Sequence, residues 1–277
     1  MSVATAHPAP AEVRPRRGPS LHVGVAARRG ITGVVVALLL WELLARTGIF
    51  SAATLPTATA VLAEMGRAIA EGTVFEPLAQ TLRGWAIGLA IVVAVAVPVG
   101  VLIGRVELLY RSVRPIFEFL RPIPGVTFLP LLLLMFGPTT TMKVWMIFLA
   151  AVWPLLYQTY YGIKAVEPVT IDTARVFQIS AFDRARKLFL PATLPYIATG
   201  FRISSAVALI VAVVAELIGG AAGLGERIYA AQTGGAYDVM YAYIAVAGCL
   251  GVVINLLTRG VERRLLSWHV LHREDVA

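Results

Sequence analysis

The stretch from Pro168 to Pro195, PVTIDTARVFQISAFDRARKLFLPATLP, is charged and helical in pattern, yet it lies between long apolar runs. Pro168 suits the first turn of a helix, where its missing N–H costs nothing, and this first helix is expected to run to about Gln178. The charged side chains belong in water, whereas Phe177 and Phe182 need a partner. The pattern therefore predicts a helix, a turn and a second helix outside the membrane.

The second helix of this stretch has its own start and stop signals. Ser180 followed by Asp183 fits a capping box, and Asp183 lies four residues before Lys187, the spacing of a helical ion pair. Pro191 and Pro195 are expected to end the helix, because proline has no N–H to donate.

The composition is that of a polytopic membrane protein. Hydrophobic residues make up 58% of the 277 and charged residues 14%, and the mean hydropathy is +0.78. Several runs approach the ~20 apolar residues that cross a bilayer as a helix. We expect an all-α fold with six transmembrane helices, with spans at 31–50, 85–103, 114–136, 144–161, 196–219 and 239–257.

The distribution of cations orients these spans. The net charge is +8 and the pI about 10.0, and most Lys and Arg residues fall in the tails and in alternate loops. The positive-inside rule then places both termini and the 168–195 stretch in the cytoplasm. The expected organisation is a disordered basic tail (1–30), a first span (31–50), an outer loop with an interfacial helix (51–80), a core (81–261) that contains the loop 168–191, and a cytoplasmic tail (262–277).

The third span has an irregular start. Arg121, Pro122 and Pro124 precede an apolar run, Val126 to Phe136, that is too short to cross by itself. A break near Pro122 to Gly125 is tolerated only against protein or a water-filled cavity. Arg121 and Pro124 are therefore candidates for a translocation pathway, and an interfacial elbow where arginines snorkel is the alternative.

The sequence lacks the common signatures of an enzyme. It contains no GxxxxGK[ST] phosphate loop, its four histidines lie in the two tails, and its single cysteine, Cys249, lies in an apolar run. We expect no metal site, no cofactor in this chain and no nucleic-acid partner.

The 168–195 stretch resembles the EAA motif of the permeases of ATP-binding cassette (ABC) importers. The spacing of the motif is matched by Asp172-Thr173-Ala174, then by position 178, and then by Leu188 and Leu190-Pro191. Asp172-Thr173 replaces Glu-Ala, and Gln178 replaces a glycine; a left-handed backbone there would cost a non-glycine residue roughly 1 to 2 kcal/mol. An ordinary amphipathic loop is the alternative.

The resemblance extends over about Leu55 to Trp268, and this segment is similar to the nitrate, sulfonate and taurine class of these permeases. It implies a type I importer architecture, a homodimer in the inner (plasma) membrane, an ATPase subunit that carries ATP and Mg²⁺, and a periplasmic or lipid-anchored solute-binding protein. It also implies that the loop is a coupling helix that docks on the ATPase, with the contact residues Asp172, Thr173, Ala174, Phe177, Gln178, Phe182, Arg184, Leu190 and Pro191.

Two polar residues of the predicted fifth span complete the pathway candidates, Arg202 and Glu216. Arg202 alternatively anchors its helix at the inner interface, and Glu216 alternatively bonds to a loop N–H or pairs with Arg227. A secondary transporter that uses Glu216 or Glu42 as a proton site is the competing function. The cargo expected from the resemblance is a small organic or inorganic anion such as a sulfonate, taurine or nitrate.

Overall fold

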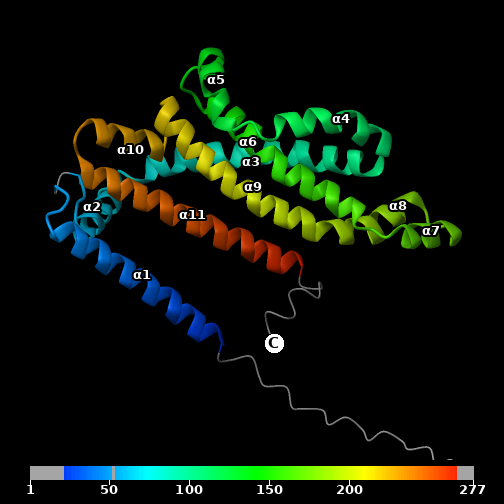
Figure 1. Cartoon of the computed structure of the whole chain (residues 1–277), viewed down its shortest axis with the longest axis horizontal. Helices are drawn as coiled ribbons and strands as arrows, with labels where there is room; N and C mark the ends of the chain where they lie inside the picture. The colour runs from blue at the N-terminus through cyan, green and yellow to red at the C-terminus, as the bar shows by residue number, and fades with distance from the viewer. Residues whose placement is uncertain (1–21, 52–53, 267–277) are drawn as a thin grey trace, which may run out of the picture.

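A computed structural model describes residues 22–51 and 54–266 of the chain, and every regular element in these residues is helical (Figure 1). In chain order the elements are α1 (His22–Arg46), α2 (Ala58–Ala70), α3 (Phe75–Arg105), α4 (Glu107–Leu120), the 3₁₀ turn η1 (Gly125–Phe128), α5 (Leu129–Phe136), α6 (Thr140–Lys164), α7 (Pro168–Val176), α8 (Ala181–Arg184), the π turn η2 (Ala185–Phe189), α9 (Leu190–Gly219), α10 (Leu224–Thr233) and α11 (Tyr237–Leu265).

Helices α3 and α6 pack closely and run in the same direction. A Cβ atom on Gly88 of α3 would lie 2.7 Å from Ile147 of α6, and one on Gly104 would lie 2.8 Å from Ile163. Residue numbers rise together along the two helices, so the pair is parallel. The glycines allow the close approach that the sequence pattern predicts for small residues at helix interfaces.

The parallel arrangement fixes the role of the segment between these helices. A chain that crosses a membrane twice in the same direction must return between the two crossings. The return is made by α4, η1 and α5, which are bent by 81° at a short break. The predicted break at Pro122 to Gly125 is confirmed, since α4 ends at Leu120 and η1 begins at Gly125.

Helix α9 runs antiparallel to α6 and completes the core. A Cβ atom on Gly200 would lie 3.1 Å from the Cα atom of Leu155, whereas one on Gly219 would lie 2.7 Å from Met142 near the start of α6. Helix α11 packs on α9. The segment α7, α8 and η2 therefore lies at one end of the core, and α2 and α10 lie at the other end (Figure 1).

The number of spans differs from the predicted six. In residues 22–51 and 54–266, four helices are long and apolar enough to cross a membrane, and the bent α4–α5 pair makes five. Helix α1 is not among them and carries Glu42 and Arg46, which pair at 2.7 Å. A sixth span at α1 stays a prediction.

Three predicted boundaries need correction. The tail assigned to residues 1–30 lies mostly outside the described residues, but α1 already begins at His22, and the Ala and Arg residues at 26–29 favour helix. Helix α3 begins at Phe75, inside the segment assigned to the outer loop, and α11 continues to Leu265, inside the segment assigned to the tail. Residues 267–277 of that tail lie outside the described part.

The prediction that Pro191 and Pro195 end a helix is wrong. Helix α9 begins at Leu190 and continues through Pro195. Pro191 lies in its first turn, where the backbone N–H is not needed, and the π turn η2 widens the helix just before it.

Candidate coupling loop and translocation pathway

Helix α7 ends in a Schellman motif whose left-handed position is Gln178. Ile179 donates its backbone N–H to the carbonyl of Ala174 at 3.0 Å, and Gln178 donates to the carbonyl of Arg175 at 2.9 Å. The φ angle of Gln178 is +53°, and every other positive φ in the described residues belongs to glycine. This position usually holds glycine because a Cβ atom is strained there.

Ser180 begins α8 as the sequence predicts. Its hydroxyl accepts the backbone N–H of Asp183 at 3.1 Å, and the Asp183 carboxylate pairs with Lys187 at 2.9 Å. The ammonium of Lys187, followed by the hydrogen bond with Ser180, lowers the pKa of Asp183. The turn between α7 and α8 is therefore held by local contacts at both of its ends.

Two aromatic side chains project from this loop into open space. Phe177 is 75% exposed and Phe182 is 74% exposed. Large exposed apolar side chains are typical of sites of protein–protein contact. Of the other candidate coupling residues, Ala174 is a buried residue of α7, and Asp172 pairs with Arg175 at 2.9 Å. Thr173, Arg184, Leu190 and Pro191 are exposed or half-buried.

Side-chain contacts tie the loop to the ends of the core helices. The guanidinium of Arg105, at the end of α3, lies 4.7 Å from the ring centroid of Phe189 in η2. Lys164, at the end of α6, pairs at 2.8 Å with Glu107 at the start of α4, and so joins these two helices beside the loop. The loop itself contacts the end of α3 through Phe189 and continues directly into α9 through η2.

The opposite end of the core contains a buried ion pair. Lys143 and Glu216 are fully buried, and Lys143 Nζ lies 2.6 Å from Glu216 Oε1. Lys143 also donates to the carbonyls of Gln80 and Ala222 at 3.2 and 2.9 Å. The second carboxylate oxygen of Glu216 accepts hydrogen bonds from the Thr81 hydroxyl at 2.9 Å and the backbone N–H of Gly225 at 3.0 Å.

This network, Lys143 with Glu216 and Thr81, joins α3, α6 and α9 to the loop before α10. Thr81 also accepts the backbone N–H of Leu224 at 3.0 Å. Gly223 is required because a Cβ atom there would collide with the Glu216 carboxyl group. A charged pair with all of these hydrogen bonds is stable inside a protein only while both partners are present.

The structure distinguishes the alternatives for Glu216. The alternative that Glu216 bonds to a loop N–H is confirmed. The alternative that it pairs with Arg227 is wrong, because Glu216 pairs with Lys143 and Arg227 pairs with Glu226 at 3.6 Å. Sequence reasoning missed Lys143 and Thr81. The available signal was a lone lysine at the start of an otherwise apolar helix, which requires an acidic partner when buried.

Arg121 and Pro124 lie at the break between α4 and α5. The guanidinium of Arg121 lies 4.8 Å from the ring centroid of Tyr157 on α6. Pro124 precedes η1 in extended conformation and is exposed. Arg121 lines an open cavity of about 380 Å³ against α6.

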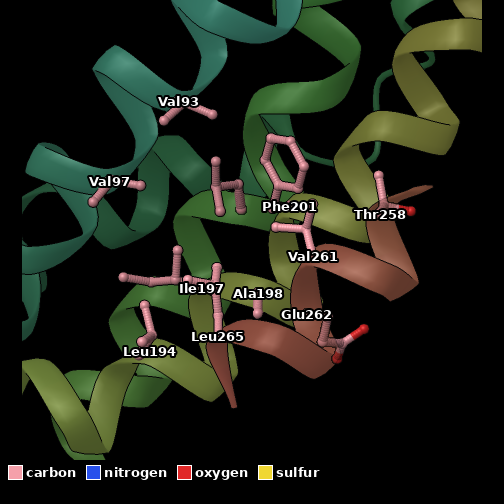
Figure 2. Close-up of a pocket in the computed structure, with 11 residues that line it drawn as sticks. Val93, Val97, Leu194, Ile197, Ala198, Phe201, Thr258, Val261, Glu262 and Leu265 are labelled. Carbon is pink, nitrogen blue, oxygen red and sulfur yellow. The ribbon is translucent and has the colours of Figure 1, made fainter. Parts of the chain in front are cut away.

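Arg202 lies on the other side of α9 and pairs with Glu262 of α11 at 3.4 Å. A separate groove of about 600 Å³ opens between α3, α9 and α11, and its walls are mainly apolar (Figure 2). Figure 2 shows that the Glu262 carboxylate points away from Val93 and Val97 across the groove. The structure therefore separates Arg202 and Glu216 from Arg121.

Comparison with known proteins identifies the family. The family described as "Binding-protein-dependent transport system inner membrane component" matches residues 96–267. The chain belongs to this family. It is an ABC importer permease, and the prediction that it is not an enzyme is confirmed.

Curated relatives of this permease cover most of its length. It is 29% identical to the putative aliphatic sulfonates transport permease protein SsuC of Bacillus subtilis, over 87% of each chain. It is 32% identical to the taurine transport system permease protein TauC of Escherichia coli, over 85% of this chain and 88% of the relative. It is 30% identical to the nitrate import permease protein NrtB of Leptolyngbya laminosa, over 69% of each chain.

A solved structure supports the fold. The permease superposes on a chain of the inward-facing MetNI methionine ABC transporter with a TM-score of 0.58 and 21% identity, over 67% of this chain and 92% of the other. The predicted all-α importer architecture is confirmed, and the permease is a multi-pass protein of the inner membrane.

Proposed function

We propose that this permease forms the translocation pathway of an ATP-driven importer for a small organic or inorganic anion, such as a sulfonate, taurine or nitrate. The names of the sulfonate, taurine and nitrate relatives support this substrate class.

The coupling element of the proposed mechanism is the loop from α7 to η2. The observation that carries it is the exposure of Phe177 and Phe182 on a helix–turn–helix fixed by Gln178 and Ser180. These side chains insert into a groove of a cytoplasmic ATPase subunit, and that subunit binds ATP and Mg²⁺. The remaining contacts come from the exposed surface around them, at Asp172, Thr173, Arg184, Leu190 and Pro191, with Ala174 packed beneath.

Nucleotide-driven closure of two ATPase subunits moves the two docked loops together. Because Arg105 of α3 contacts Phe189 and η2 continues directly into α9, the motion of the loop reaches α3 and α9 together. A ligand or partner shifts a conformational equilibrium only through contacts that differ between the states, and this loop is the element built for such contacts.

The assembly that fits this mechanism is a homodimer embedded in membrane lipid. A solute-binding protein, periplasmic or lipid-anchored, delivers the cargo to the end of the core that carries α2 and α10. Both termini and the coupling loop lie in the cytoplasm, in agreement with the distribution of Lys and Arg. Helix α1 then crosses as the sixth span, and in Figure 1 it runs in the opposite direction to α11.

Within the pathway, Arg121 and Pro124 at the helix break contact the moving solute. Arg202 holds α9 to α11 through Glu262. Glu216 has no exposed surface and serves as a structural lock rather than a solute contact.

A secondary transporter driven by an ion gradient is not favoured. A proton site must be reached by water, and Glu216 is sealed between Lys143, Thr81 and a loop N–H. Such a transporter would also need no ATPase. Uptake that persists without the ATPase subunit and collapses with an uncoupler would favour it over the proposed function.

The proposed coupling is tested by Phe182→Asp in the complete transporter, reconstituted with its ATPase and binding protein. The substitution removes an aromatic contact with the ATPase and places a poorly solvated carboxylate in the docking groove. Uptake is therefore expected to fall by at least about 30-fold. Arg184→Glu should also reduce uptake. The matched control is Phe182→Leu, which keeps an apolar side chain and should retain most uptake. Normal uptake in both charged variants, with normal amounts of folded permease, refutes the assignment.

A further inference from the structure

The cavity at the break between α4 and α5 has a different chemical character from the groove in Figure 2. Its walls combine one cation with aromatic and amide side chains, namely Arg121, Trp153, Tyr157, Gln158 and Tyr161. Its volume of about 380 Å³ is within the range of small-molecule sites in proteins. The groove in Figure 2 is mainly apolar, and its one charged side chain, Glu262, is an anion.

Arg121 differs from the other arginines of its helix. Arg111 pairs with Glu107 at 3.1 Å, and Arg114 pairs with Glu118 at 2.7 Å. Within residues 22–51 and 54–266, Arg121 forms no ion pair, and its guanidinium lies instead over the face of Tyr157. A guanidinium stacked on an aromatic ring keeps its N–H edge available for an anion.

Arg121 is exposed, but the aromatic ring that it lies over is well inside the end of α6. Tyr157 lies seven residues before Lys164, the last residue of α6, which at 1.5 Å per residue is about 10 Å inside the end of the helix. The break beside Arg121 exposes backbone that a membrane tolerates only against protein or a water-filled cavity. An ionisable residue at such a place is a functional candidate by default.

The other walls define the kind of anion that fits. Gln158 adds amide donors, which suit the same negatively charged head group. The rings of Trp153 and Tyr161 offer flat apolar surface to the body of a ligand. Phe117 packs against the Trp153 ring, with centroids 5.7 Å apart, and so holds that wall in place.

We propose that this cavity is a substrate-binding site of the permease itself, for the oxyanion head of a small organic sulfonate or carboxylate. Arg121 and Gln158 bind the head group, and the aromatic rings contact the carbon body. The inference rests on the proposed function, because it names a solute contact within that pathway. The site lies in the half of the span nearer the coupling loop, so it is a late contact before release.

The test is equilibrium binding of radiolabelled benzenesulfonate to the purified complex of permease and ATPase, with no binding protein added. Saturable binding is expected. Arg121→Gln should weaken it by about 10- to 100-fold, since a charge-assisted bidentate contact is lost. Gln158→Leu, which keeps the size of the side chain, should weaken it by about threefold to tenfold.

The matched control is Arg111→Gln, which removes an exposed arginine from the same helix and should leave the affinity within about twofold. Thermal unfolding of each variant verifies that the complex is folded. The proposal is overturned by absence of saturable binding up to about 1 mM. It is also overturned if the Arg121→Gln variant is folded and its affinity for benzenesulfonate is unchanged.

A separate measurement distinguishes this proposal from the proposed function. Stimulation of ATP hydrolysis by the binding protein and its cargo is recorded with the same complex. If stimulation is normal and the Arg121-dependent binding is absent, the site is wrong and the importer function stands. If the ATPase neither docks nor responds, the proposed function itself fails.

Discussion

The two ends of the permease core differ in where their charged side chains lie, buried at one end and exposed at the other. At the end with α2 and α10, Lys143 and Glu216 are fully buried and have hydrogen bonds on every side. At the other end, the loop from α7 to η2 has its ion pairs on the surface, with Phe177 and Phe182 exposed above them.

The contrast shows where each end can change. Surface ion pairs contribute little to stability and break easily, whereas a buried pair that loses one partner leaves a charge without compensation. The buried network therefore holds three helices as one unit. The exposed loop is stabilised by short-range contacts and is free to meet another protein.

The largest expected effect is at the buried network. Lys143→Met leaves the Glu216 carboxylate without its cation, and the free energy of unfolding should fall by about 3 to 5 kcal/mol. Denaturant unfolding of the purified permease in detergent measures this loss. The double variant Lys143→Met with Glu216→Gln removes both charges and should recover a large part of it. Equal stability of Lys143→Met and wild type would contradict the role of the network.

A smaller effect is expected in the loop, and with opposite sign. Gln178→Gly relieves the strained left-handed backbone, although glycine also raises the entropy of the unfolded chain, so α7 should gain about 1 kcal/mol. Hydrogen exchange of the α7 amides should slow by about fivefold. Gln178→Asn, which tolerates positive φ better than glutamine, should fall between the two. Faster exchange in the glycine variant would show that the turn is not strained.

The smallest effect concerns pH at the start of α8. The pKa of Asp183 lies below the ordinary aspartate value of 3.8 because Lys187 and Ser180 favour the carboxylate. A lowered folded-state pKa contributes stability that is present above the unfolded value and is lost as pH falls through the folded one. The difference in thermal unfolding between wild type and Asp183→Asn should therefore be present at neutral pH and disappear in acid below 3.8. A difference that does not change with pH would remove this assignment.

Much of the fold could be predicted from local sequence signals. Apolar length marked the core spans. The prolines before Val126 marked the break in the third span. These features succeed because each depends on a few neighbouring residues. Helix α1 is harder, because Glu42 and Arg46 interrupt its apolar run and their effect depends on what surrounds it.

The site was only partly predictable for the same reason. Ser180 and Gln178 were found because caps and turns are local. The pairing of Lys143 with Glu216 joins residues 73 positions apart, so no local pattern reveals it. The prediction from Pro191 and Pro195 was wrong. Proline usually ends a helix, but here the helix continues through both prolines after the π turn that precedes them.

That π turn, Ala185–Phe189, also sets the phase of α9. A π turn takes one residue more per turn than the α-helix, so it rotates everything that follows by about 100° relative to an uninterrupted α-helix. Deletion of one residue from this turn would rotate α9 about its own axis and would move Arg202 away from Glu262 and Glu216 away from Lys143. The extra residue of the π turn therefore sets which face of α9 each of these side chains occupies.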